Sequence, residues 1–171
     1  MQRDLHGWLR ALAGCEHWLA AVTVPHHAPR DGMSDAGTVD PIEVISASGQ
    51  ELTYIIRAVY RPTATNFITP PELKQQVGYV VYPAGAEIPR HVHRAIERHI
   101  VGTSEVLVIK SGHCLIDIYD DARQLIATRD LRVGDVVLMV GGGHGFRMVE
   151  DTVLLEVKQG PYTGLDEKER F

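Results

Sequence analysis

This chain of 171 residues has few cysteines, no stripe of basic residues and no long apolar run. Cys15 and Cys114 are its only cysteines, which is too few for the disulfide framework of a small secreted domain. The net charge of −5 and the scattered Lys and Arg residues argue against a nucleic-acid partner. No apolar run approaches the roughly 20 residues that cross a bilayer, so we expect no membrane segment. Residues 1–7 lack the basic start and apolar core of a signal peptide. We therefore expect a cytoplasmic protein with a small-molecule substrate.

The spacing of the apolar residues changes near residue 40. Leu5, Trp8, Leu9 and Leu12 recur at intervals of three and four, which predicts a short helix, and a polar linker follows. Beyond Pro41 the apolar residues alternate with a period of two, which is typical of strands. We therefore expect a helical segment and linker in residues 1–40 and one all-β domain in residues 41–171.

Turn residues divide the expected β-domain into short strands. The first hairpin joins residues 42–45 to residues 52–57 through Ser48-Gly49-Gln50. Further strands are expected at residues 77–82, 105–110, 114–119, 125–128, 136–140 and 152–157. Many short strands with no long helix between them are typical of an antiparallel sandwich or barrel.

The clearest chemical signal is His91-Val92-His93 together with a distant His144. Side chains at i and i+2 of an extended segment point the same way, so two imidazoles share one side. A third imidazole from another strand, with a nearby carboxylate, would complete a small metal cage. Neutral imidazole is a common ligand for zinc, copper, iron and nickel.

Three motifs in chain order resemble those of the cupins, which are small β-barrels. Residues 83–93 resemble the first cupin motif, in which a Gly and five further residues lead into His-x-His. Residues 105–112 resemble the next strand, which begins with a ligand Glu and ends in Gly. Gly134-Asp135 resembles the opening of the second motif, which leads here to His144.

The resemblance covers residues 78–158, and the segment also resembles a group of small bacterial cupins without a secure activity. It implies a single-domain cupin barrel, also called a double-stranded β-helix or jelly roll. The ligand set that it implies is His91, His93, a glutamate and His144.

Two departures from the cupin pattern affect this ligand set. Glu97 has the usual separation from His93, whereas Glu105 has the usual place at the start of a strand, so both are candidates for the carboxylate ligand. We favour Glu105, because a strand holds its side chain in place more firmly than a loop does. The second motif reads Val140-Gly141-Gly142-Gly143-His144, which is one residue short and lacks the usual proline.

Three imidazoles and one carboxylate suit one divalent transition metal, namely iron, manganese, nickel or zinc, with positions left open for a substrate. We expect a metal-dependent enzyme, either a dioxygenase or an isomerase or lyase, that acts on a small polar molecule. The molecule would be anionic or sugar-derived.

Arg90, Arg94 and Arg147 are the candidates for binding an anionic group of the substrate. The alternative is a non-catalytic cupin that holds a metal or small ligand as a sensor, a store or a structural site. We also expect a homodimer.

Overall fold

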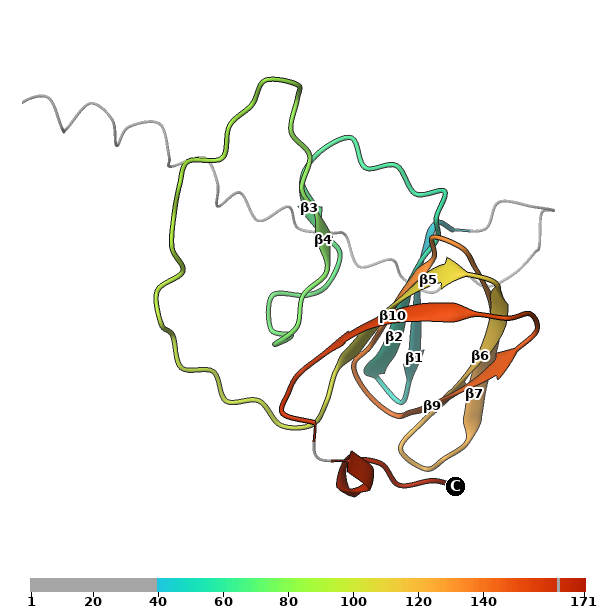
Figure 1. Cartoon of the computed structure of the whole chain (residues 1–171). Coiled ribbons are helices and arrows are strands. Elements are labelled where there is room, and N and C mark those ends of the chain that lie inside the picture. Colours follow the sequence, from blue (N-terminus) through green and yellow to red (C-terminus); the bar gives the residue numbers. More distant parts are fainter. Residues whose placement is uncertain (1–39, 163) are drawn as a thin grey trace, which may run out of the picture. The chain divides into compact units, whose positions relative to one another are not determined.

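The computed structural model describes residues 40–162 and 164–171, and this part of the chain is all-β (Figure 1). Within it, no helix is long and apolar enough to cross a bilayer. The helical segment expected in residues 1–40 lies, except for Asp40, outside the described residues. The described strands are β1 (Ile42–Ala47), β2 (Gln50–Ile56), β3 (Asn66–Phe67), β4 (Gly78–Tyr79), β5 (Glu105–Ser111), β6 (His113–Tyr119), β7 (Leu125–Arg132), β8 (Val136–Met139), β9 (Gly143–Met148) and β10 (Val153–Lys158), followed by a short 3₁₀ helix, η1 (Gly164–Glu167).

The described strands form three antiparallel sheets. The largest has the order β1-β2-β8-β5-β10, the second has the order β7-β6-β9, and β3 pairs with β4. These sheets do not close into a barrel, because residues 80–104 contain no strand and join neither of the larger sheets (Figure 1). In the described residues β9 and β10 therefore each have a strand neighbour on one side only. The all-β class is confirmed, and the cupin barrel remains a proposal.

The β1–β2 hairpin has the turn that its sequence predicts. Ser48 and Gly49 both have positive φ angles, 52° and 79°. Two successive residues in this region form the tight turn whose twist matches that of the flanking strands. The hairpin expected around Ser48-Gly49-Gln50 is therefore confirmed, with strands slightly longer than predicted.

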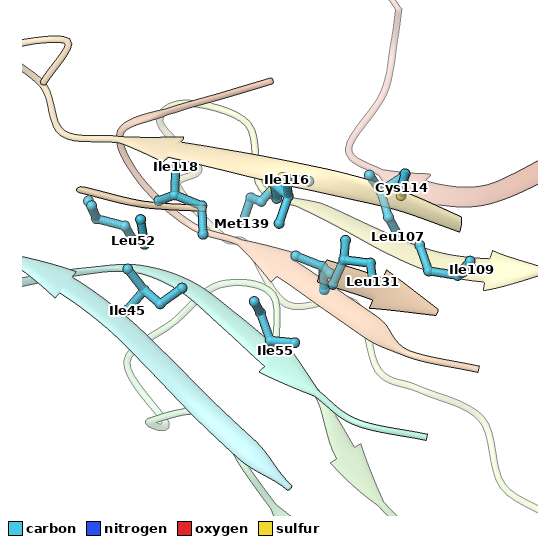
Figure 2. Packing of buried hydrophobic residues seen from close by; sticks show 12 residues of the cluster. Ile45, Leu52, Ile55, Leu107, Ile109, Cys114, Ile116, Ile118, Leu131 and Met139 are labelled. Carbon is cyan, nitrogen blue, oxygen red and sulfur yellow. The ribbon is translucent and has the colours of Figure 1, made fainter. Parts of the chain in front are cut away.

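The hydrophobic core lies between the two larger sheets (Figure 2). On β5 and β6 alternate residues are buried in this core, namely Leu107 and Ile109 on β5 and Ile116 and Ile118 on β6. Each such side chain contributes roughly 1.5–3 kcal/mol when fully buried. The same alternation places Glu105, the first residue of β5, on the inward side of its strand.

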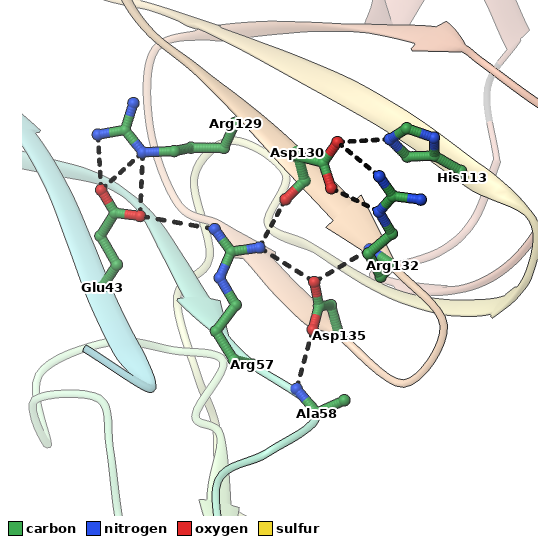
Figure 3. A network of polar contacts seen from close by, with 8 residues as sticks. All are labelled: Glu43, Arg57, Ala58, His113, Arg129, Asp130, Arg132 and Asp135. Carbon is green, nitrogen blue, oxygen red and sulfur yellow. Dashed lines mark hydrogen bonds and ion pairs between the residues drawn. The ribbon is translucent and has the colours of Figure 1, made fainter. Parts of the chain in front are cut away.

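A polar network surrounds Asp135, which lies with Gly134 in the turn between β7 and β8 (Figure 3). The network links this turn to the residues that follow β2. The Asp135 carboxylate accepts hydrogen bonds from the Arg57 side chain at 3.0 Å, the Ala58 backbone at 2.8 Å and the Arg132 backbone at 3.0 Å. Arg57 also donates to the Asp130 carbonyl, so it connects β2 with β7. Because a buried carboxylate must be fully bonded, Asp135 has a structural role here.

Candidate metal centre

Glu105 on β5 and His144 on β9 come together across the two larger sheets. His144 Nε2 lies 3.2 Å from Glu105 Oε2. The Glu105 side chain is 9% exposed and that of His144 is 30% exposed, so the carboxylate is the inner partner. An imidazole and a carboxylate in contact, with the ring toward solvent, are two donors that one cation can reach.

The strand that carries His144 begins directly after a tight glycine turn. Gly142 has a φ of 62°, and a Cβ atom there would collide with the Tyr119 carbonyl oxygen. Only glycine adopts this φ angle readily and has no Cβ atom to collide with Tyr119, so Gly142 fixes the start of β9. His144 then pairs in register with Ile118 of β6. We did not predict this strand, because three glycines precede or begin it and glycine weakens a strand pattern.

Burial lowers the pKa of His144 below its ordinary value of 6.5. The negative charge of Glu105 acts in the opposite direction, because it favours the charged ring, and Lys168 reinforces the lowering. Burial and Lys168 therefore favour the neutral ring, which is the form that binds metals.

A cleft of about 1000 Å³ opens beside this pair. Its aromatic wall consists of Tyr119, Phe146 and Phe171, and Lys168 also lines it. Phe146 shares the His144 face of β9, with ring centroids 5.8 Å apart. Phe146 follows His144 by two residues, so a strand at this place predicts that both side chains face the cleft. No local pattern indicates that Lys168 or Phe171 lines it.

His91 and His93 lie together in a different place, in the segment 80–104. Their ring centroids are 5.2 Å apart, so the two rings are neighbours as their spacing predicts. Both side chains are exposed, and His91 Nδ1 lies 3.0 Å from the Pro89 carbonyl oxygen. In the described residues, no group of three or more His, Cys, Asp or Glu side chains is placed to hold a metal ion. The structure thus brings the four expected ligands together as two pairs.

The other expected site residues are also divided between these regions. Glu97, Arg90 and Arg94 are exposed in the segment 80–104, whereas Glu105 is the carboxylate next to His144. Arg147 lies three residues after His144, on the opposite face of β9, and makes two hydrogen bonds of 3.0 Å to Asp117. Its guanidinium is therefore already paired, and we do not assign it to the substrate.

Cys114 is fully buried in the hydrophobic core. Burial raises the pKa of its thiol, and the charges of Asp130 and Asp135 raise it further. A protonated, enclosed thiol is a packing residue and a poor metal ligand. Cys114 is therefore a packing residue of β6.

No family model matches the chain, and neither a curated protein nor a solved structure matches it. The cupin resemblance therefore rests on the sequence motifs, and the function rests on the chemistry of the residues described above.

Proposed function

We propose that the chain binds one divalent transition metal through Glu105, His144, His91 and His93. The observation that carries the proposal is the 3.2 Å contact between the buried Glu105 carboxylate and the His144 ring, beside a cleft. Nitrogen and oxygen donors of this kind suit iron, manganese, nickel or zinc. Glu97 remains the alternative carboxylate.

The four ligands meet if the segment around His91-Val92-His93 joins the free edge of β9. Two observations support this step. The edge of β9 away from β6 has no strand neighbour in the described residues, so its backbone groups are available for pairing. The segment itself exposes aliphatic side chains, with Val92 88% exposed and Ile96 65% exposed, which a paired segment would cover. Metal binding would then supply the free energy for ordering the segment.

The bound metal would polarise a small polar molecule chelated in the cleft or, if it is iron, support oxygen chemistry. The chain's own contribution is the aromatic wall and the inward position of Glu105. We propose a dioxygenase, or an isomerase or lyase, acting on an anionic or sugar-derived molecule. A homodimer remains a prediction, which light scattering of the purified chain would test.

The ligand set is tested by metal titration of the 171-residue chain and its variants. Wild-type protein should bind one nickel ion per chain, and a variant combining His91→Ala with His93→Ala should bind it much more weakly. Glu105→Gln should also lose affinity, whereas Glu97→Gln, its matched control, should not. The opposite result for the two glutamates would make Glu97 the ligand. Unchanged binding in all of these variants would refute the site.

Limited trypsin digestion tests the pairing of the segment with β9. Arg90, Arg94 and Arg98 are exposed cleavage sites within it, and Lys74 is an exposed control site outside it. Saturating nickel should slow cleavage at the three arginines and leave cleavage after Lys74 unchanged. If nickel binds and cleavage at the arginines does not slow, the segment does not move onto the sheet.

The non-catalytic alternative differs from the enzyme in what the metal does for stability. An enzyme site should lose turnover in the His91→Ala and His144→Ala variants with only a modest fall in Tm. A metal that mainly holds strands together should instead raise Tm strongly, and chelation should abolish that increase.

A further inference from the structure

The segment 167–171, which follows the motifs that resemble cupins, forms one wall of the cleft. It is held there by contacts with β5, β6, β10 and the turn after β6. These contacts are Glu167 with Lys158 at 3.2 Å, Lys168 with Glu105 at 3.7 Å, Glu169 with Arg123 at 2.6 Å, and the Phe171 ring against Tyr119 with centroids 5.2 Å apart. Arg123 also lies over the Phe171 ring, 5.2 Å from its centroid.

Lys168 is the member of this segment that reaches the proposed metal ligand. Its Nζ lies 3.7 Å from Glu105 Oε1, while His144 Nε2 lies 3.2 Å from the other oxygen, Oε2. The carboxylate is therefore shared between an imidazole and an ammonium group. The Lys168 side chain is 53% exposed, so it has room to turn away from Glu105.

The anchoring of the segment does not depend on this contact. Glu167 and Glu169, on either side of Lys168, are each paired with a cation of the main body, and Phe171 is packed against Tyr119. If Lys168 leaves Glu105, its backbone stays in place and its charge stays over the cleft. An ammonium group has three donors and no acceptor, so it then requires a negative or oxygen-rich partner.

A divalent cation on Glu105 would face the Lys168 ammonium at short range, and like charges at that distance repel each other. We propose that Lys168 determines what the cleft binds, because it competes with the metal for Glu105 and, once displaced, pairs with a carboxylate of the substrate. This inference rests on the proposed metal site and adds the substrate class, a small carboxylate. It assigns the anion-binding role to a residue outside the arginines that the sequence indicates.

The proposal predicts two opposite changes in a single variant. Lys168→Met should bind cobalt(II) more tightly, because the competing charge is gone, and its cobalt form should bind acetate more weakly. Each change should be about two- to fivefold, the usual size for an ion pair near the surface. Both are measured by visible absorption, first in a cobalt titration and then in an acetate titration of the cobalt-loaded chain.

Matched variants separate a specific role from a general change in charge. Lys168→Arg keeps the charge and should behave like the wild type. Lys110→Met removes an exposed lysine of β5, five residues from Glu105 and therefore roughly 16 Å away, and should change neither affinity. Arg170→Gln removes the other unassigned cation of the cleft wall and should leave acetate binding unchanged.

The outcomes distinguish this inference from the proposed function. If wild-type protein binds no cobalt, the metal site itself is refuted. If wild-type protein binds cobalt and Lys168→Met matches it in either cobalt or acetate affinity, the role of Lys168 is refuted and the metal site stands. Loss of acetate binding in Arg170→Gln alone would also overturn the assignment to Lys168.

Discussion

Two histidine–carboxylate pairs in this protein have opposite arrangements. In the His113–Asp130 pair the imidazole is the inner partner, 11% exposed, and the carboxylate is 48% exposed. In the His144–Glu105 pair the carboxylate is the inner partner and the ring borders a cleft. Asp130 also accepts a hydrogen bond from Arg132 at 2.8 Å, so two side chains contact this carboxylate. A covered ring with an exposed carboxylate stabilises the fold, whereas an accessible ring on a buried carboxylate can bind a ligand.

The largest expected effect comes from removing the accessible ring. His144→Ala should weaken nickel binding more than about a hundredfold, since the loss of even an outer-shell partner typically costs 10–100-fold. Its free energy of unfolding without metal should fall by about 1 kcal/mol, because the buried Glu105 carboxylate loses one partner and keeps Lys168. Calorimetric titration and urea denaturation measure the two quantities. A large loss of stability with binding preserved would reverse the comparison.

The turn before His144 should be the next most sensitive position. Gly142→Ala forces a side chain into a left-handed conformation and against the Tyr119 carbonyl, so it should lower the free energy of unfolding by roughly 3 kcal/mol. It should also weaken nickel binding, because the start of β9 must shift. Gly145→Ala, where a Cβ atom meets open space, is the control and should cost much less. Equal effects of the two substitutions would mean that the turn does not position His144.

Removing the covered ring should change stability and leave metal binding unaffected. His113→Ala leaves a cavity and deprives Asp130 of one partner, so we expect a loss of roughly 2 kcal/mol in unfolding free energy. Nickel affinity should match that of the wild type. Weaker nickel binding in this variant would show that the two pairs are coupled.

The smallest effect is expected on the far face of β9, where Arg147 is paired with Asp117. Hydrogen bonds from Arg147 and Thr128 hold the pKa of Asp117 below its ordinary 3.8. A depressed pKa contributes stability above that ordinary value, and the contribution is lost as the pH falls through the folded-state pKa. Asp117→Asn should therefore lower stability by less than about 1 kcal/mol at pH 7, since the pair is close to the surface.

The pH dependence gives this prediction its test. Urea denaturation of the wild type and of Asp117→Asn should show that the difference between their free energies of unfolding narrows below pH 3.8. The nickel affinity of the variant at pH 7 should equal that of the wild type. A difference in stability that widens in acid would mean that Asp117 stabilises the fold in its protonated form.

The sequence predicts those parts of the fold that depend on neighbouring residues. The Ser48-Gly49 turn and the buried alternation of β5 and β6 follow from local geometry, and each was confirmed. β9 was missed, because its strand character comes from pairing with β6 and its glycines hide it. Only Gly78–Tyr79 of the strand expected at residues 77–82 pairs, and it pairs with β3.

The candidate site was predictable to a similar degree. The order of the cupin-like motifs implies that Glu105 and His144 belong to one site, and the structure brings the two side chains into contact. The contact with Lys168 joins two residues that are far apart in the sequence, at positions 105 and 168, and nothing near either residue indicates it. His91-Val92-His93 lies in the exposed segment 80–104, and its position depends on long-range contacts that local alternation does not determine.

Glu105 belongs to the five-stranded sheet and His144 to the three-stranded sheet, so the distance between them depends on how closely the two layers pack. The affinity for a cation held by both residues would therefore depend on the separation of the two sheets, and it would fall whenever they move apart. Substitutions deep in the core, far from any ligand, would therefore alter metal affinity without touching the coordination chemistry.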